Sequence, residues 1–106
     1  MSVVFNDVLA QRLKKIQNVL GKKAEEYASA GDRFHNFRVA ARIKNETPER
    51  ALLGIWMKHI VSVLDLIDWI ESSPEKITLE LIDEKIGDNI NYLILLEGLL
   101  IGRVNK

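Results

Sequence analysis

Several residue types are missing or scarce in this 106-residue chain, and their absence excludes whole classes of function. There is no cysteine, so disulfides, thiolate nucleophiles and thiolate-bound zinc or iron are excluded. The two histidines cannot form a zinc site by themselves. Any metal is therefore expected to be a hard ion held by oxygen ligands.

The chain also lacks an excess of charge of one sign. Its 15 basic and 15 acidic side chains cancel, so no general attraction to nucleic acid or anionic lipid is expected. Residues 1–7 do not have the basic and apolar regions of a secretory signal, and the most apolar segment, residues 92–101, is too short to span a bilayer. We expect a cytoplasmic protein with neither nucleic acid nor membrane as partner.

The apolar residues recur at spacings of three and four, which predicts an all-α helical bundle. Long helices are expected over residues 6–27, 48–71 and 79–101 and a short one over residues 33–43, all in a single domain, 1–106. Asn6, Thr47 and Thr78 are candidate N-caps, because their side-chain oxygens can accept from amides of the first helical turn. Gly102 with Arg103 can close the last helix.

The end of the last predicted helix is apolar on every side. From Tyr92 to Ile101, only Glu97 is charged. Such a helix has to be buried all round, and a chain of this size has only a modest core in which to bury it. We therefore expect a homo-oligomer that associates through this C-terminal helix.

An acidic stripe lies on the same predicted helix. Glu84 and Asp88 are four residues apart and point the same way, and Asn91 falls in the same stripe. Two carboxylates on adjacent turns can share Mg²⁺, which prefers oxygen ligands. The alternative is a solvated helix face, since acids at this spacing are common on surface helices.

The preceding helix carries a second polar stripe. Lys58, Ser62 and Asp65 lie within a narrow arc, and His59 is next to it. These groups could bind a phosphate and a metal-bound water, or they could be hydrogen-bonded within their own helix, with His59 structural. If this stripe faces the acidic stripe across a groove, Asp65 becomes a third oxygen ligand.

The connection over residues 22–37 is rich in groups that bind nucleotides. Tyr27, Phe34 and Phe37 can stack on a base, Asn36 can read a base edge, and Lys23 and Arg33 can hold phosphate. The alternative is the capped end of a helix whose aromatic side chains pack inward.

Four segments together resemble small phage and prophage proteins of the nucleotide-modification-associated domain type. They are Lys23-x-x-Glu26-Tyr27, residues 32–37, Lys58-His59-x-x-Ser62-x-x-Asp65, and residues 84–92. The last segment also resembles the final metal-binding helix of the all-α nucleoside triphosphate pyrophosphohydrolases of the MazG and dimeric dUTPase kind. Those enzymes are oligomeric bundles that use magnesium. They carry a further Glu-Glu-x-x-Glu cluster that is missing here, and Lys85 stands where another glutamate is expected.

The resemblance implies a phage-type protein that binds a nucleotide and cleaves pyrophosphate from it. The implied nucleotide-binding residues are Lys23, Glu26, Tyr27, Arg33, Asn36, Phe37, Asn91 and Tyr92. The implied Mg²⁺ ligands are Glu84, Asp88 and Asp65, and the implied catalytic residues are Lys58, His59 and Asp65. The alternative is a non-catalytic oligomeric helical adaptor that binds a protein partner through its C-terminal helix.

Overall fold

The computed structural model describes residues 4–22 and 32–105, and the regular structure in these ranges is entirely helical, as the sequence predicts. The elements are α1 (Val4–Ile16), a short segment η1 (Gln17–Lys22) that continues it with a kink at Gly21, α3 (His35–Lys44), α4 (Pro48–Ser72), a 3₁₀ turn η3 (Pro74–Lys76) and α5 (Leu79–Val104). The predicted end of the first helix at residue 27 lies outside the described residues.

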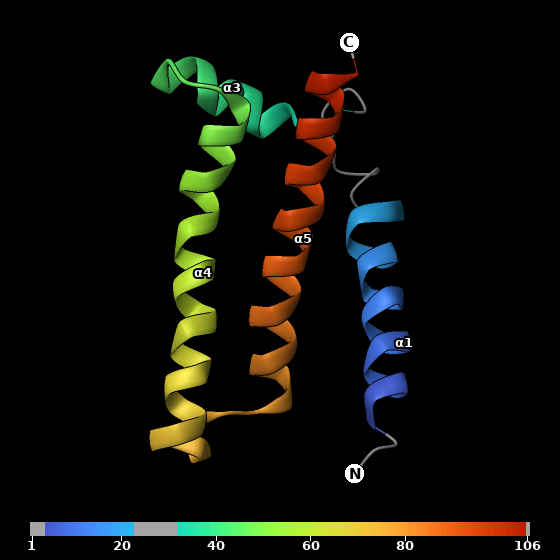
Figure 1. The fold of residues 1–106 in the computed structure, drawn as a ribbon, viewed down its shortest axis with the longest axis vertical. Coiled ribbons are helices and arrows are strands. Elements are labelled where there is room, and N and C mark those ends of the chain that lie inside the picture. The colour runs from blue at the N-terminus through green and yellow to red at the C-terminus, as the bar shows by residue number, and fades with distance from the viewer. Residues whose placement is uncertain (1–3, 23–31, 106) are drawn as a thin grey trace.

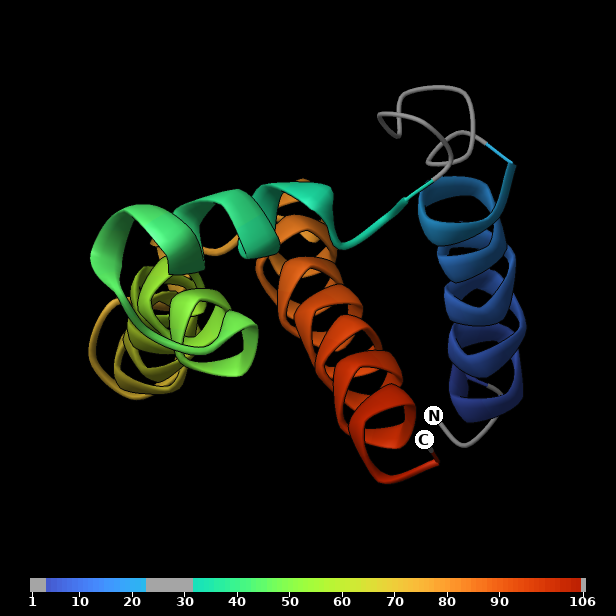
Figure 2. The ribbon, with the colours of Figure 1, turned by 90° about the horizontal axis from the view of Figure 1, so that it is seen from above.

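The three long helices lie side by side, with α5 in the middle (Figure 1). α4 and α5 form an antiparallel pair joined through η3, and α1 lies along the other side of α5. Seen from above, α3 covers one side of this row at one end, and no described element covers the opposite side (Figure 2). The chain therefore forms a single layer of long helices with one partly covered face.

Two of the predicted helix starts are confirmed by their capping hydrogen bonds. The Thr47 side chain accepts from the Arg50 amide at 3.1 Å, and the Thr78 side chain accepts from the Leu81 amide at 3.0 Å. Proline at the first position of α4 fits because a first-turn amide has no partner within the helix. Asn45, with φ 56°, ends α3 in the left-handed conformation that asparagine tolerates well.

Two predicted boundaries are wrong. α1 begins at Val4, so Asn6 lies within the first turn and is not the N-cap. α5 continues through Gly102 to Val104. The bidentate pair between Arg103 and Glu49, at 2.6 and 2.9 Å, ties this last turn to α4 and offsets the low helix propensity of Gly102.

The core lies at the end of the row that α3 covers. Phe37 of α3, Leu52 of α4 and Leu99 of α5 are buried together, and Leu52 is completely inaccessible to solvent. Half-buried side chains surround this cluster, among them Phe34, Trp56, Tyr92, Leu95 and Leu96. α1 contributes no buried side chain, so it is attached to the rest of the chain in a different way.

Candidate functional site

The two predicted polar stripes meet at one point between α4 and α5. His59 Nδ1 of α4 lies 3.4 Å from Asp88 Oδ2 of α5, and the His59 and Tyr92 rings are in contact with their centroids 5.1 Å apart. Burial, with a smaller contribution from the Asp88 carboxylate, raises the pKa of the Tyr92 phenol. Tyr92 is therefore neutral near pH 7 and keeps its hydroxyl proton.

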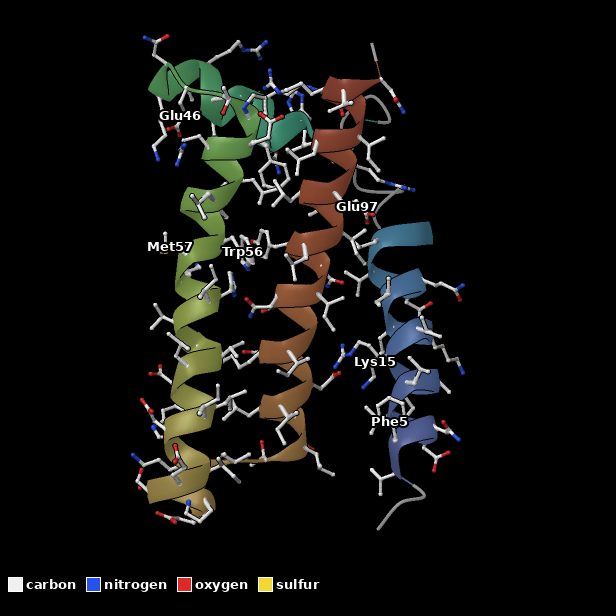
Figure 3. The ribbon with its side chains drawn as sticks, in the orientation of Figure 1. Phe5, Lys15, Glu46, Trp56, Met57 and Glu97 are labelled. Atoms are coloured by element: carbon white, nitrogen blue, oxygen red, sulfur yellow. The ribbon has the colours of Figure 1, made fainter. Side chains whose placement is uncertain are left out.

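Asn89 fixes the register of the two helices at this point. Its side-chain oxygen accepts from Trp56 Nε1 at 2.9 Å, and its amide nitrogen donates to the backbone carbonyls of His59 and Lys85, both at 2.8 Å. Trp56 points from α4 toward α5 (Figure 3). Because both N–H groups of Asn89 and its oxygen are used, α4 and α5 can slide past each other only by breaking this set of bonds.

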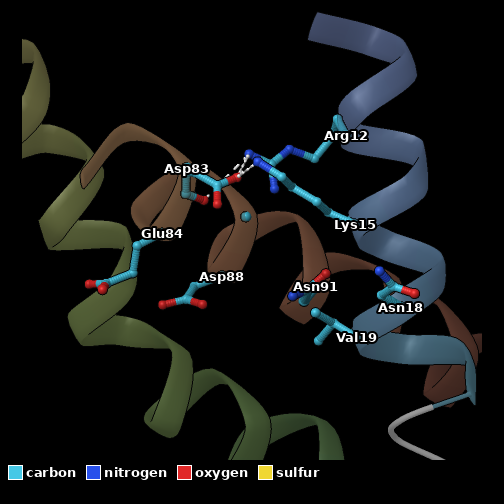
Figure 4. Close-up of a pocket in the computed structure, with 9 residues that line it drawn as sticks. Arg12, Lys15, Asn18, Val19, Asp83, Glu84, Asp88 and Asn91 are labelled. Atoms are coloured by element: carbon cyan, nitrogen blue, oxygen red, sulfur yellow. Dashed lines mark hydrogen bonds and ion pairs between the residues drawn. The ribbon is translucent and has the colours of Figure 1, made fainter. Parts of the chain in front are cut away.

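A cleft of about 310 Å³ opens between α1 and α5 (Figure 4). We call it the α1–α5 cleft. One wall is formed by α1 with η1 and the other by α5, and the lining residues are Arg12, Lys15, Asn18, Val19, Asp83, Glu84, Gly87, Asp88 and Asn91. Three of the sequence-predicted residues, Glu84, Asp88 and Asn91, thus share one wall of a cleft.

Asp83 joins the two walls of the cleft. Arg12 Nη2 and Lys15 Nζ lie 2.8 and 2.9 Å from the same Asp83 oxygen (Figure 4). The hydrogen bond from Lys15, reinforced by the charges of Lys15 and Arg12, lowers the pKa of the Asp83 carboxyl. Asp83 therefore stays ionised at any pH near neutrality and holds both cations at the cleft.

Two glycines let other segments approach α5 closely. A Cβ atom on Gly87 would lie 2.6 Å from Arg12 Nη1, and one on Gly98 would lie 2.8 Å from the Phe34 ring. Glycine inside a helix costs about 1 kcal/mol relative to alanine. At both positions the close neighbour explains why a residue without a side chain is present. The two are 11 residues apart, which is close to three turns, and so they share the face of α5 that Arg12 and Phe34 approach.

The predicted metal ligands do not form a closed metal-binding group, although Glu84 and Asp88 both line the cleft. The Glu84 side chain is 61% exposed and lies 3.1 Å from Lys85 Nζ. Asp65 follows His59 by six residues, about 9 Å of helix rise. Within residues 4–22 and 32–105, no three acidic or histidine side chains come together as a metal-binding group. Ser62 donates to the Lys58 carbonyl at 3.1 Å, as the intrahelical interpretation of that stripe predicts.

The predicted nucleotide-binding residues of the connection are dispersed. Lys23, Glu26 and Tyr27 lie outside the described residues. Phe37 is 8% exposed and packs in the core, which is the arrangement that the inward-packing interpretation predicts. Asn36 is exposed on α3, and Arg33 donates to the Gly21 carbonyl at 3.2 Å.

Several residues of the site were missed by the sequence reasoning, chiefly Arg12, Lys15 and Asn18. Nothing in the local pattern of α1 shows which of its cations will face another helix. The glycine inside α5 at position 87 was the available signal, because a glycine at mid-helix usually marks a close approach.

In comparisons with known proteins, the chain matches no family model, no curated protein and no solved structure. The resemblance to phage nucleotide-modification-associated proteins and to MazG-like hydrolases therefore stays a prediction. None of the described helices combines the length and the apolar character needed to cross a membrane.

Proposed function

We propose that this protein binds a nucleotide, with its phosphates in the α1–α5 cleft. The observation that carries the proposal is the composition of the two walls. Arg12 and Lys15 on α1 and Asn18 on η1 line the same cleft as two acids and an amide on α5, namely Glu84, Asp88 and Asn91. A volume of about 310 Å³ is at the lower end of the range for small-molecule sites.

The α1 wall carries the chemistry that recognises phosphate. A guanidinium binds two phosphate oxygens at once, and an ammonium adds a compact positive charge. Arg12 and Lys15 are already side by side because both contact Asp83. A phosphate entering the cleft would compete with Asp83 for them, so part of its binding energy would be used to loosen that contact.

The α5 wall fits a magnesium ion shared with the nucleotide better than one held by protein alone. Mg²⁺ commonly uses one or two protein carboxylates together with water and substrate phosphates. Two cations and three carboxylates line the cleft, a net charge of −1, so a bare phosphate would be repelled. Glu84 and Asp88 would hold the ion, whose positive charge would offset that of the phosphates, and Asp65 is left out of this site.

Cleavage of pyrophosphate is the second part of the proposal, and His59 is the residue to test for it. Asp88 lies 3.4 Å from His59 Nδ1, an arrangement in which a carboxylate can orient an imidazole that accepts a proton. Lys58 is exposed on α4 and does not line the cleft. Binding is therefore the conclusion that the geometry supports best, and hydrolysis depends on it.

Thermal unfolding with a panel of ribo- and deoxyribonucleotides, with and without Mg²⁺, tests binding, because a ligand that binds the native state raises its melting temperature. We expect one nucleotide class to stabilise the protein in a magnesium-dependent way. Asp88→Asn should remove the magnesium dependence and Lys15→Ala should reduce the shift. The matched controls, Asp68→Asn and Lys14→Ala, change residues outside the cleft and should leave it intact.

A protein-binding adaptor is the second candidate function. It is favoured by the exposed apolar side chains of α4 and α5, for example Ile67, Ile70 and Ile101. The same experiment separates the two candidates, because an adaptor would show no stabilisation by any nucleotide or by magnesium. The absence of a ligand-induced shift in the wild-type chain, the cleft variants and their controls alike would remove the nucleotide proposal.

A further inference from the structure

A second concave surface runs between α4 and α5. This shallow depression has a volume of about 420 Å³, and we call it the apolar groove. Its apolar lining side chains are Ile60, Val63, Leu64, Ile86, Ile90 and Leu93. Trp56 and Asn89 complete the lining, but the Trp56 N–H and both N–H groups of Asn89 donate within the chain. The groove therefore presents no free side-chain donor, and an occupant has to be apolar.

The apolar groove and the α1–α5 cleft open on different faces of the molecule. At about 100° per residue, Ile86, Ile90 and Leu93 lie on the side of α5 nearly opposite Asp88 and Asn91. Gly98, which is approached by Phe34 at the start of α3, shares a face with Gly87 in the cleft. The groove thus belongs to the side of the row that α3 leaves uncovered (Figure 2).

Too much apolar surface surrounds this groove for a protein that functions as a single copy. Leu64 is 54% exposed and Leu93 49% exposed, and Ile67 and Ile82 extend the apolar surface along the same helices. Contiguous apolar patches of this kind mark interaction surfaces in soluble proteins.

The total surface area points the same way. The accessible surface is 7989 Å², about 2,000 Å² more than a compact monomer of 12.1 kDa exposes. The radius of gyration is 16.1 Å, against about 13 Å for a compact chain of this length. A standard interface buries about 800 Å² on each partner, so the excess is large enough for a stable dimer.

We propose that the occupant of the apolar groove is a second copy of this chain. Helical domains are built from at least two packed layers, and one copy supplies a single layer of long helices. Two copies related by a two-fold axis would bury the same groove on both sides at once, forming a four-helix core from both α4–α5 pairs. With a formal net charge of zero, the copies do not repel each other.

This proposal does not depend on nucleotide binding. It also places the self-association surface differently from the sequence-based prediction. The sequence predicted self-association through residues 92–101. Within that segment Leu93 lines the groove, whereas Leu99 packs in the core of its own chain. α4 therefore supplies half of the contact surface, and the apolar end of α5 supplies only part of the other half.

Sedimentation velocity over a range of concentrations tests the proposal. We expect the wild-type chain to sediment as a dimer of about 24 kDa, twice the mass of the chain. Leu64→Glu and Leu93→Glu should each shift it to a monomer, because two-fold symmetry places the new charge at the interface twice. The matched control Ile43→Glu changes an apolar residue that is 80% exposed outside the groove and should remain a dimer. A wild-type monomer at every concentration, or groove variants that stay dimeric, would overturn the proposal.

A second measurement covers the case in which the glutamate variants fail to fold. Because the chain has no cysteine, Ile67→Cys introduces a single thiol that can carry a nitroxide label beside the groove. We expect a dipolar interaction between the labels of the two copies, which dilution with unlabelled protein should weaken. If undiluted labelled protein shows no such interaction, the groove does not face a second copy.

Discussion

The two helices that flank α5 are attached to it by different forces. α4 is joined through buried apolar side chains, with Leu52 and Leu99 in one cluster, and through the fully bonded Asn89. α1 buries no side chain and is held through the ion pairs of Arg12 and Lys15 with Asp83. Full burial of a leucine contributes about 1.5–3 kcal/mol, whereas an exposed ion pair contributes about 0–1 kcal/mol.

This difference gives the α1–α5 cleft one fixed wall and one wall that can be displaced. The fixed wall carries Glu84 and Asp88, and the displaceable wall carries Arg12 and Lys15. A phosphate ligand could therefore be gripped by movement of α1, without any change in the α4–α5 pair.

The largest expected difference between the two attachments is in the effect of replacing a leucine of α4 and a leucine of α1. Leu52→Ala should lower the free energy of unfolding by about 2–5 kcal/mol, because it leaves a cavity in the core. Leu13→Ala on α1, where the side chain is 53% exposed, should change it by no more than about 0.5 kcal/mol. Urea unfolding followed by circular dichroism measures both. Equal losses would mean that α1 is packed as firmly as α4.

Local chemistry explains which parts of the fold could be predicted. Thr47 followed by Pro48, and Thr78, determine helix starts through bonds to amides three residues away, and both predictions are correct. Asn6 offers the same chemistry, but α1 begins before it. Helix ends are less determined, because a distant contact such as Arg103 with Glu49 can extend a helix past a glycine.

The site was predictable only within each helix. The spacing of Glu84, Asp88 and Asn91 placed them on one face, and all three line the cleft. The meeting of His59 with Asp88 depends on the register of α4 against α5, which Asn89 sets through long-range bonds. No local pattern encodes that register. The choice of Arg12 and Lys15 as the opposite wall likewise depends on how α1 approaches Gly87.

The second prediction tests whether Asn89 locks the α4–α5 pair. Asn89→Leu should cost about 1–3 kcal/mol, because it leaves the Trp56 N–H without its acceptor in a half-buried region and removes the bond that Asn89 donates across to the His59 carbonyl. Ser62→Ala is the control, since its hydroxyl bonds only to a carbonyl of its own helix, and we expect a change near zero. Urea unfolding with tryptophan emission as the signal measures both. A Leu variant as stable as the wild type would show that apolar packing alone fixes the register.

The third prediction uses the two glycines of α5. Gly98→Ala should be destabilising by about 1–3 kcal/mol, because the new methyl group meets the rigid Phe34 ring at 2.8 Å. Gly87→Ala meets only the end of the flexible Arg12 side chain, which can move away. The gain in helix propensity, about 1 kcal/mol, should then leave stability unchanged or slightly higher.

The readout that separates the two glycines is nuclear magnetic resonance of the α1 amides combined with thermal unfolding. Gly87→Ala should shift the α1 resonances while the melting temperature holds, and Gly98→Ala should lower the melting temperature. If Gly87→Ala instead has a much lower melting temperature than the wild type, the contact between α1 and α5 contributes to the stability of the core.

The smallest expected effect is the release of α1 in acid. The folded-state pKa of Asp83 lies below its ordinary value of 3.8, because Lys15 and Arg12 favour the carboxylate. A carboxyl with a lowered pKa contributes stability that is complete above the unfolded value and is lost as the pH falls through the folded value. The attachment of α1 should therefore be constant from neutral pH down to about 4 and weaken only below 3.8. In a titration of the α1 amide resonances, wild-type protein should show a transition in that acid range and Asp83→Asn should show none. A transition that persists in Asp83→Asn would mean that another group holds α1 on α5, and the contrast between the two sides of α5 would then not rest on this ion pair.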